Sequence, residues 1–337
     1  MTEASPTKEK VEIPLADVKS ICRDALNGFI SPVSVVDEVL SQLLDAELRG
    51  KQSHGLVRIP WLKKRLKRIE HQAAIKQEIS PWFSRFECSK SIGYVAAREA
   101  TEDLQRILAD QPFGISVCAS AFPTGVIGNY LSDLSSSGYI AMGIATSPAL
   151  VSLAPGEKPL LGTNPIALAL PAFENKPAFI ADISPAPATF GQLLSMLFGN
   201  EGDLEELSVL NGDGQQPSEA GEMFDDQIRL VGQIVQQFNT SAQRRSYALT
   251  IAIQLLTILF AGDSPRGALV LMALDPKRIP GLHLTETINF LEKMTQRGAT
   301  VPGAHGEAHL NKQYQKGTLS LPVPLWHAIQ SLASACN

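Results

Sequence analysis

A histidine and an arginine stand four residues apart in the segment SHGLVRIP, which spans residues 53–60. On a helical turn two residues at this spacing share one face, so His54 and Arg58 can face the same pocket. The planar guanidinium of Arg58 matches a carboxylate through two parallel hydrogen bonds, and His54 can donate to a substrate oxygen. Taken alone, the segment is also consistent with a helix cap followed by a surface arginine.

A second polar cluster lies in the segment GTNPIALALP, residues 162–171. The glycine and the Asn-Pro pair predict a turn that leads into an apolar strand. Backbone amides at this turn, together with the side chains of Thr163 and Asn164, could bind a carboxylate or a phosphate. The segment by itself is more typical of a plain turn before a buried strand.

Several common sites are missing from the sequence. It contains no GxGxxG after a predicted strand, no GxxxxGK[ST] and no HExxH, which argues against a standard Rossmann domain, a P-loop enzyme or a zinc protease. His305 and His309 are spaced like metal ligands on a helix. Gly303 and Gly306 weaken that helix, and no third ligand is evident nearby. We therefore predict no metal site and interpret this segment as the start of a surface helix.

The composition is that of a globular protein without a basic face. Of the 337 residues, 44% are hydrophobic and 19% charged, and the net charge is −5, so nucleic acid is not an expected partner. The four cysteines, which are Cys22, Cys88, Cys118 and Cys336, form no CxxC pair. We expect reduced thiols in a cytoplasmic protein.

No membrane segment is expected either. Residues 1–12 are polar and lack the apolar core of a secretory signal. The longest apolar run, residues 247–261, is interrupted by polar side chains and is short for a bilayer span. We interpret it as a buried helix.

Hydrophobic periodicity predicts an α/β chain. A strand at 114–118, a helix at about 125–136 and a strand at 139–144 form one α/β unit, and Ser31-Pro32 marks a helix start within the helical region 15–50. Further strands are predicted at 166–170, 178–182 and 267–274, and further helices at 56–70, 93–109, 247–261, 285–297 and 322–334.

Taken together, the motifs resemble those of the malate/L-lactate dehydrogenase family, which also includes ureidoglycolate dehydrogenase, diketogulonate reductase and piperideine-2-carboxylate reductase. SHGLVRIPWLKKRL resembles the family's SHGxxRxPxYxxxL, PLLGTNPIA (159–167) its PLxGTNPxA, and Val301-Pro-Gly303 part of its RxPGE. The likeness covers about residues 11–333. It implies the family's own non-Rossmann α/β fold with a mixed sheet. In this fold a helical N-terminal segment (1–80) packs with residues 285–337, and residues 81–284 form the α/β nucleotide-binding core.

The resemblance also implies a site, a cofactor and an assembly. The cofactor is NADPH or NADH, the substrate is a small carboxylate, and the assembly is a homodimer with sites near the subunit boundary. His54 is the candidate catalytic residue. Substrate contacts are implied for Ser53, Arg58, Phe122, Thr163 and Asn164, and cofactor contacts for Ser120, Gly162, Asp182, Ser184, Arg245, Pro302 and Gly303.

The chain departs from the family at several of these positions. The family's NSxHFG, which carries an acid/base histidine, is replaced by ASAFPTG (119–125), so Phe122 or Pro123 stands at the histidine position. DMATS becomes DISPA (182–186), HKGYGL becomes RRSYAL (244–249), and the arginine of RxPGE becomes Thr300. These changes indicate an active site that is either rebuilt or lost.

Two functions follow from this pattern. A ketone reductase needs a general acid for the developing alkoxide, and His54 is then the candidate donor. A cyclic iminium 2-carboxylate already carries its proton, so its reduction tolerates Phe122, and we favour this substrate over a 2-oxo acid. The alternative is a scaffold or regulatory binding protein that has kept the fold and lost the chemistry.

Overall fold

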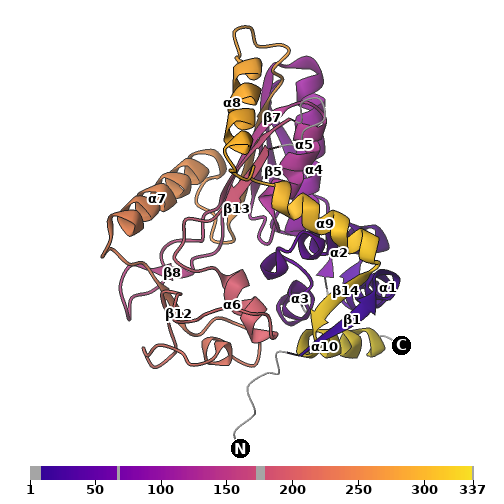
Figure 1. Cartoon of the computed structure of the whole chain (residues 1–337), viewed down its shortest axis with the longest axis vertical. Helices are drawn as coiled ribbons and strands as arrows, with labels where there is room; N and C mark the ends of the chain where they lie inside the picture. The colour runs from indigo at the N-terminus through magenta and orange to yellow at the C-terminus, as the bar shows by residue number, and fades with distance from the viewer. Residues whose placement is uncertain (1–8, 67–68, 172–178, 336–337) are drawn as a thin grey trace, which may run out of the picture.

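The computed structural model describes residues 9–66, 69–171 and 179–335. Its largest element is a seven-stranded mixed sheet (Figure 1). In spatial order the strands are β10 (Phe179–Ile183), β9 (Ile166–Leu170), β7 (Ile140–Thr146), β13 (Ala268–Leu274), β6 (Phe113–Ala119), β5 (Phe83–Glu87) and β4 (Ile75–Ser80). Only β5 and β6 pair in parallel, and every other neighbouring pair is antiparallel. The predicted mixed α/β fold is confirmed.

Both faces of the sheet are covered, as the apolar sequence of β13 requires. Helices α4 (Gly93–Asp110) and α5 (Ile127–Ser136) pack on one face, and α7 (Ser241–Ala261) packs on the other. Because side chains alternate along a strand, Leu269 and Leu271 join the core under α4 and α5. Val270 joins the smaller core under α7.

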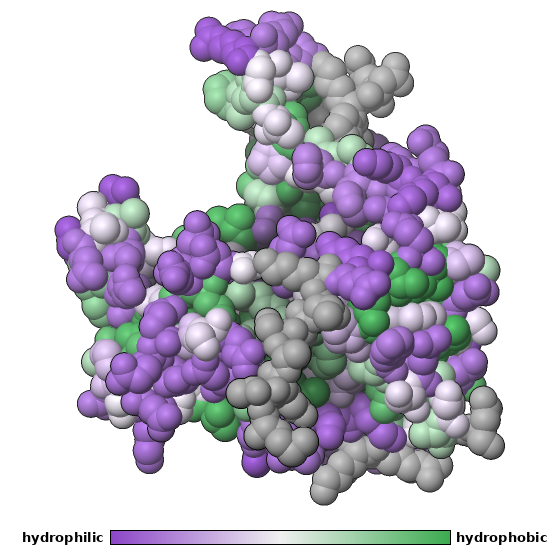
Figure 2. Space-filling model, turned by 60° about the horizontal axis from the view of Figure 1, so that its bottom comes forward, coloured by the Kyte–Doolittle hydropathy of each residue, from purple (hydrophilic) through white to green (hydrophobic). Residues whose placement is uncertain are grey.

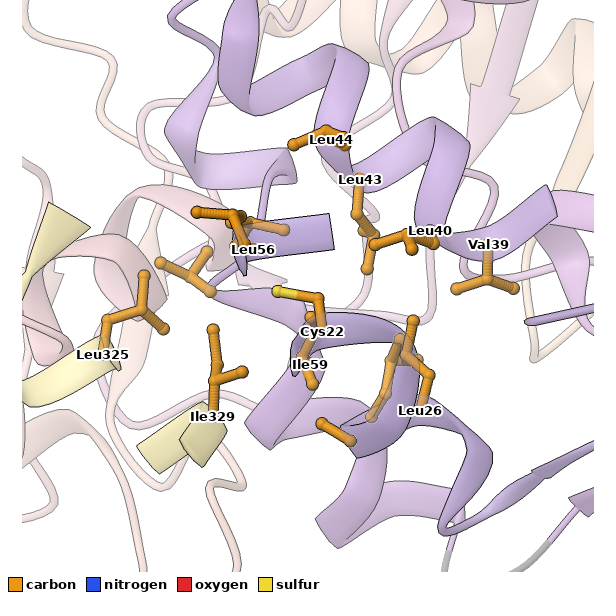
Figure 3. Close-up of a cluster of buried hydrophobic side chains, with 14 of the residues drawn as sticks. Cys22, Leu26, Val39, Leu40, Leu43, Leu44, Leu56, Ile59, Leu325 and Ile329 are labelled. Carbon is orange, nitrogen blue, oxygen red and sulfur yellow. The ribbon is translucent and has the colours of Figure 1, made fainter. Parts of the chain in front are cut away.

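The two ends of the chain fold together. Strand β1 (Lys10–Pro14) pairs antiparallel with β14 (Thr318–Pro322), and α1 (Leu15–Asn27) packs against α10 (Val323–Ser334). Helices α2 (Val33–Leu48) and α3 (Arg58–Leu66) complete this helical cluster. Figure 3 shows its core, in which Cys22, Leu26, Val39, Leu40, Leu43, Leu44, Leu56, Ile59, Leu325 and Ile329 lie together.

Smaller elements connect the cluster and the sheet. Helix α6 (Phe190–Leu197) begins with a capping box between Thr189 and Gln192. Strands β11 (Val209–Leu210), β12 (Gln233–Val235) and β8 (Val151–Ser152) form a small sheet, and β2 (Ile30–Ser31) pairs with β3 (Ile69–Glu70). The remaining elements are the 3₁₀ turns η1 (Gln52–His54) and η2 (Ala220–Met223) and the helices α8 (Leu284–Gln296) and α9 (Ala304–Lys316).

Helix α9 contains the two histidines that are spaced like metal ligands. The Nδ1 of His309 lies 2.7 Å from the carbonyl oxygen of Leu48, so this side chain ties α9 to the end of α2. Among the described residues, no group of three or more His, Cys, Asp or Glu side chains could hold a metal ion. Cys22, Cys88 and Cys118 are buried free thiols, and Cys336 lies outside the described residues.

Three predicted elements differ from the structure. The helical region 15–50 is two helices, and α2 begins after Pro32, not at it. The helix predicted over 56–70 begins at Arg58 and ends at Leu66. The helix predicted over 247–261 begins at Ser241 and is not buried: Leu255 is 62% exposed and Leu259 76%.

Exposure of α7 follows from its position at the edge of the molecule. The helix has apolar residues of its own on all sides, but only one side packs against the sheet. On that side Thr250, Ile253, Thr257 and Ala261 are buried. Figure 1 shows α7 standing away from the rest of the fold, and Figure 2 shows a polar surface interrupted by smaller hydrophobic patches. In the described part of the chain, no helix combines the length and the hydropathy that a membrane crossing requires.

Candidate active site

A cavity of about 280 Å³ lies between the helical cluster and the sheet. Seven of the predicted site residues line it: Ser53, His54, Arg58, Phe122, Thr163, Asp182 and Ser184. Tertiary structure also brings Lys51, Ser147, Thr189, Phe190 and Gly191 to the cavity wall. Sequence reasoning missed these five. Lys51 was the easiest of them to find, since it directly precedes the SHGLVR motif.

Arg58 is the main positive charge in the depth of this cavity. Its side chain is at the start of α3, only 5% exposed, and its Nε donates to the carbonyl oxygen of Ser53 at 2.9 Å. The guanidinium carbon lies 5.4 Å from the ring centre of Trp61 and 5.5 Å from that of Phe190. Burial lowers the pKa of Arg58 below its usual value.

No carboxylate among the described residues forms an ion pair with Arg58. A buried cation without a counter-ion is costly, so such sites commonly bind an anion. Gly191 leaves room for the guanidinium, because a Cβ at that position would lie 2.7 Å from Nη2 of Arg58. The charge and burial of Arg58 therefore suit the binding of an anion such as a carboxylate.

His54 is neutral at physiological pH. Burial, together with the positive charges of Arg58 and Lys51, lowers its pKa to about 3. Its Nδ1 lies 2.9 Å from the hydroxyl oxygen of Ser53. A neutral imidazole can still exchange a hydrogen bond with a substrate oxygen. It does not hold the spare proton of an imidazolium, so the predicted role of His54 as a general acid has no support from its surroundings.

The turn that carries Ser53 and His54 is held from behind by Glu47. This carboxyl is 2% exposed, and its Oε2 accepts a hydrogen bond from the backbone N–H of Leu56 at 2.8 Å. Burial raises the pKa of Glu47 to about 7. Nothing in the sequence alone singled out Glu47, which lies on the buried face of α2 among apolar residues.

Within the GTNP turn, Thr163 and Pro165 line the cavity, whereas Gly162 and Asn164 do not. Asn164 is fully buried, has a positive φ of 41° and donates through Nδ2 to the carbonyl oxygen of Thr250 and to Oε1 of Gln254, both at 3.0 Å. It fastens the turn to α7 and does not line the cavity. Gly162 is needed for close packing, since a Cβ there would lie 2.8 Å from the backbone nitrogen of Ser147.

Several of the predicted cofactor segments lie in strand β10 or contact it. Asp182 accepts a hydrogen bond from the N–H of Gly128 at 2.8 Å and lies 3.5 Å from Nζ of Lys51. One residue beyond the strand, Ser184 donates to the carbonyl oxygen of Thr163 at 2.6 Å.

Two further segments attach to the same strand. Ser246, in the first part of α7, donates to the carbonyl oxygen of Pro185 at 2.7 Å. The carbonyl oxygen of Pro302 accepts from the N–H of Ile180 at 3.0 Å, and Gly303 packs against Ile180. The altered DMATS, HKGYGL and RxPGE elements are therefore neighbours in the fold.

Of the predicted cofactor residues, Asp182 and Ser184 line the cavity, whereas Ser120, Gly162, Arg245, Pro302 and Gly303 do not. Ser120 has a φ of 60°, and its backbone N–H donates to the hydroxyl oxygen of Ser264 at 3.1 Å. Arg245 is exposed near the start of α7. Neither residue lines the 280 Å³ cavity.

Of the two residues aligned with the missing histidine, Phe122 lines this cavity and Pro123 does not. The ring of Phe122 lies 6.0 Å from that of Trp61 at an interplanar angle of 74°. The rings of Phe122 and Phe190 make one wall of the cavity apolar and supply no group that can transfer a proton.

Solved structures of other proteins share this fold. A dehydrogenase structure from Sinorhizobium meliloti has a TM-score of 0.78 at 23% identity and covers 97% of this chain and 99% of that one. The Δ1-piperideine-2-carboxylate reductase from Pseudomonas syringae has a TM-score of 0.76 at 17% identity and covers 96% and 99%.

Curated relatives span nearly the whole chain. A (2R)-3-sulfolactate dehydrogenase (NADP(+)) from Chromohalobacter salexigens is 22% identical over 95% of this chain and 98% of its own. A Δ1-pyrroline-2-carboxylate/Δ1-piperideine-2-carboxylate reductase from Pseudomonas aeruginosa is 24% identical over 87% and 90%. The profile of malate/L-lactate dehydrogenases matches residues 13–330. This chain therefore belongs to the malate/L-lactate dehydrogenase family.

Proposed function

We propose that this protein is an NADPH- or NADH-dependent oxidoreductase that reduces a cyclic imine 2-carboxylate in preference to a 2-oxo acid. One observation carries the proposal: the buried, unpaired guanidinium of Arg58 shares its cavity with the apolar ring of Phe122. The first group suits the carboxylate that both substrate classes contain. The second stands where a ketone reductase needs a proton donor.

The side chains of the cavity suit binding and orientation. Arg58 binds the substrate carboxylate, Thr163 and Ser53 offer hydroxyl groups, and Phe122 gives that side of the cavity an apolar surface. The hydroxyl and carboxylate groups of Ser184 and Asp182 beside this cavity suit an uncharged amide such as the carboxamide of nicotinamide. When bound, the reduced nicotinamide ring supplies a hydride.

Proton supply separates the two substrate classes. A ketone requires a positioned acid, worth about a hundredfold to ten-thousandfold in rate. At pH 7, His54 is neutral because its pKa is lowered to about 3, and Phe122 has no proton to give. An iminium ion carries its proton into the site, and hydride addition turns it into a neutral amine. Relatives named for cyclic imine substrates support this choice, whereas those named for sulfolactate and malate support the 2-hydroxy acid class.

Dinucleotide binding tests the proposal first. A ligand at a hundred times its Kd stabilises the folded state by about 2.7 kcal/mol, so NADPH or NADH should raise the melting temperature. Oxidation of NAD(P)H is then followed with cyclic imine 2-carboxylates and with pyruvate or oxaloacetate. If neither dinucleotide moves the melting curve at millimolar concentration, the scaffold function replaces the enzymatic one.

A homodimer is part of the same proposal. The outer side of α7 carries apolar residues that this single chain leaves exposed or half-buried: Ala248, Leu249, Ala252, Leu255, Leu256 and Leu259. A continuous apolar helix face is typical of a contact with another protein, and α7 also carries Ser246, which is bonded to the segment beside the cavity. We further propose a cytoplasmic location, which the three buried free thiols support.

A further inference from the structure

A second cavity of about 220 Å³ adjoins the first. Phe122, Leu150 and Phe190 line both, so these three side chains form the partition between them. The second cavity is further lined by Trp61, Ile228 and Leu230. Its walls are therefore mainly aromatic and aliphatic, unlike the polar wall that Thr163 and Ser184 give the first cavity.

A fixed turn forms the outer wall of the second cavity. Ile228 has a φ of 53°, a conformation that a β-branched residue adopts only under strain. Oδ1 of Asp225 accepts hydrogen bonds from the backbone N–H of Gln227 at 3.0 Å and of Arg229 at 2.9 Å. Ile228 itself donates to the carbonyl oxygen of Asp225 at 2.8 Å. These bonds hold the strained turn in place, so the cavity is formed before any ligand binds.

The charges around the second cavity leave its interior apolar. The guanidinium of Arg229 lies 2.6 Å from the carboxylate of Asp225, which neutralises it. Arg65 lies at the exposed edge. A ligand in this cavity therefore gains from burial of hydrocarbon and has no isolated cation to satisfy.

The carboxylate anchor lies next to this space. Trp61 and Phe190 flank the guanidinium of Arg58, and both rings also line the second cavity. A carboxylate bound to Arg58 can thus extend its side chain past Phe190 and Phe122 into the apolar space.

We propose that the second cavity is a side-chain subsite, and that it selects carboxylates with an extended aliphatic or aromatic side chain over carboxylates as small as pyruvate. This inference rests on the proposed function, because it takes Arg58 as the carboxylate anchor. Each methylene that enters such a cavity strengthens binding about fourfold. The gain should stop once the cavity is filled.

Inert carboxylic acids test the subsite without any turnover. Dissociation constants of acetate, butyrate, hexanoate and 4-phenylbutyrate are measured by NMR titration of the full chain. In the wild type, affinity should rise about fourfold per methylene. Ala149→Trp, which fills the second cavity from its wall, should abolish that gain and leave acetate binding unchanged. Ala73→Trp, at an exposed position outside the helices and strands, is the matched control and should behave as the wild type does.

Three results would overturn the subsite: equal affinities along the series in the wild type, no effect of Ala149→Trp, or tighter binding of glutarate than of pentanoate. The last would show that the arginines at the edge select a second carboxylate. Failure of the proposed function has a different signature, which is length-dependent carboxylate binding without any melting shift from NADPH or NADH. Failure of the subsite alone leaves that melting shift intact.

Discussion

Glu47 and Gly55 touch directly behind the substrate cavity: a Cβ at position 55 would lie 2.1 Å from Oε2 of Glu47. The same oxygen accepts the hydrogen bond from the N–H of Leu56. The glycine of the SHG motif is thus required by a buried carboxyl on another helix. Since His54 directly precedes that glycine, Glu47 sets the position of the turn that carries His54.

Glu47 should make the stability of the fold depend on pH. Burial raises its pKa from 4.5 to about 7. A raised carboxyl pKa contributes stability that is fully present below pH 4.5 and is lost as pH rises through 7. Glu47→Gln keeps the acceptor and removes the ionisation. Its free energy of unfolding should therefore exceed that of the wild type by an amount that grows between pH 4.5 and 7 and levels off above pH 7, at roughly 3 kcal/mol.

The measurement is urea unfolding between pH 5 and 8.5. Glu201→Gln, at an exposed position outside the helices and strands, is the control and should leave the pH profile unchanged. Parallel pH profiles of the wild type and Glu47→Gln would contradict the prediction.

Arg58→Lys should weaken carboxylate binding, because an ammonium cannot reproduce the two parallel hydrogen bonds of a guanidinium. A loss of about 1.5–3 kcal/mol is expected for a charged hydrogen bond, and it is read from KM or from the Kd of a competitive carboxylate. Arg23→Lys, in an exposed ion pair with Asp37, should have no effect. Unchanged binding in Arg58→Lys would remove Arg58 from the substrate site.

Phe122→His should restore a proton donor at the cavity wall. The rate with a 2-oxo acid should rise by about a hundredfold or more, while the rate with a cyclic imine should stay nearly constant. Wild-type imine reduction should also fall as pH rises through the pKa of the iminium ion. Both rates are followed as oxidation of NAD(P)H. Fast wild-type turnover of pyruvate or oxaloacetate that His54→Ala abolishes would refute the preference for imines and identify His54 as the acid.

Two aspartates on the outer side of α7 should disrupt the proposed dimer. Leu255 and Leu259 are 62% and 76% exposed in the single chain and lie one turn apart. The double variant Leu255→Asp/Leu259→Asp would bury two charges in an apolar contact, so it should sediment as a monomer at concentrations at which the wild type is a dimer. Leu282→Asp is the control, because Leu282 is 41% exposed and lies outside α7. A wild type that sediments as a monomer would end the dimer proposal.

The sequence alone determined the chemical part of this protein. The spacing of His54 and Arg58, the GTNP turn and the replacement of a histidine by Phe122 or Pro123 are local patterns, and they pointed to the family and to several residues of the cavity wall. Strands such as β13 and helices such as α4 were also predictable, because their apolar periodicity reflects burial that each element needs.

Only the tertiary structure decided which of these residues work together. Asn164 was predicted to face the substrate, yet its amide turns to α7, because a buried amide needs partners and those come from a helix 86 residues or more along the chain. The burial expected for α7 failed for the same kind of reason, since periodicity shows which residues are apolar and not whether a neighbour covers them. The second cavity beyond Phe122 arises where segments distant in sequence meet, and no local pattern specifies such a meeting.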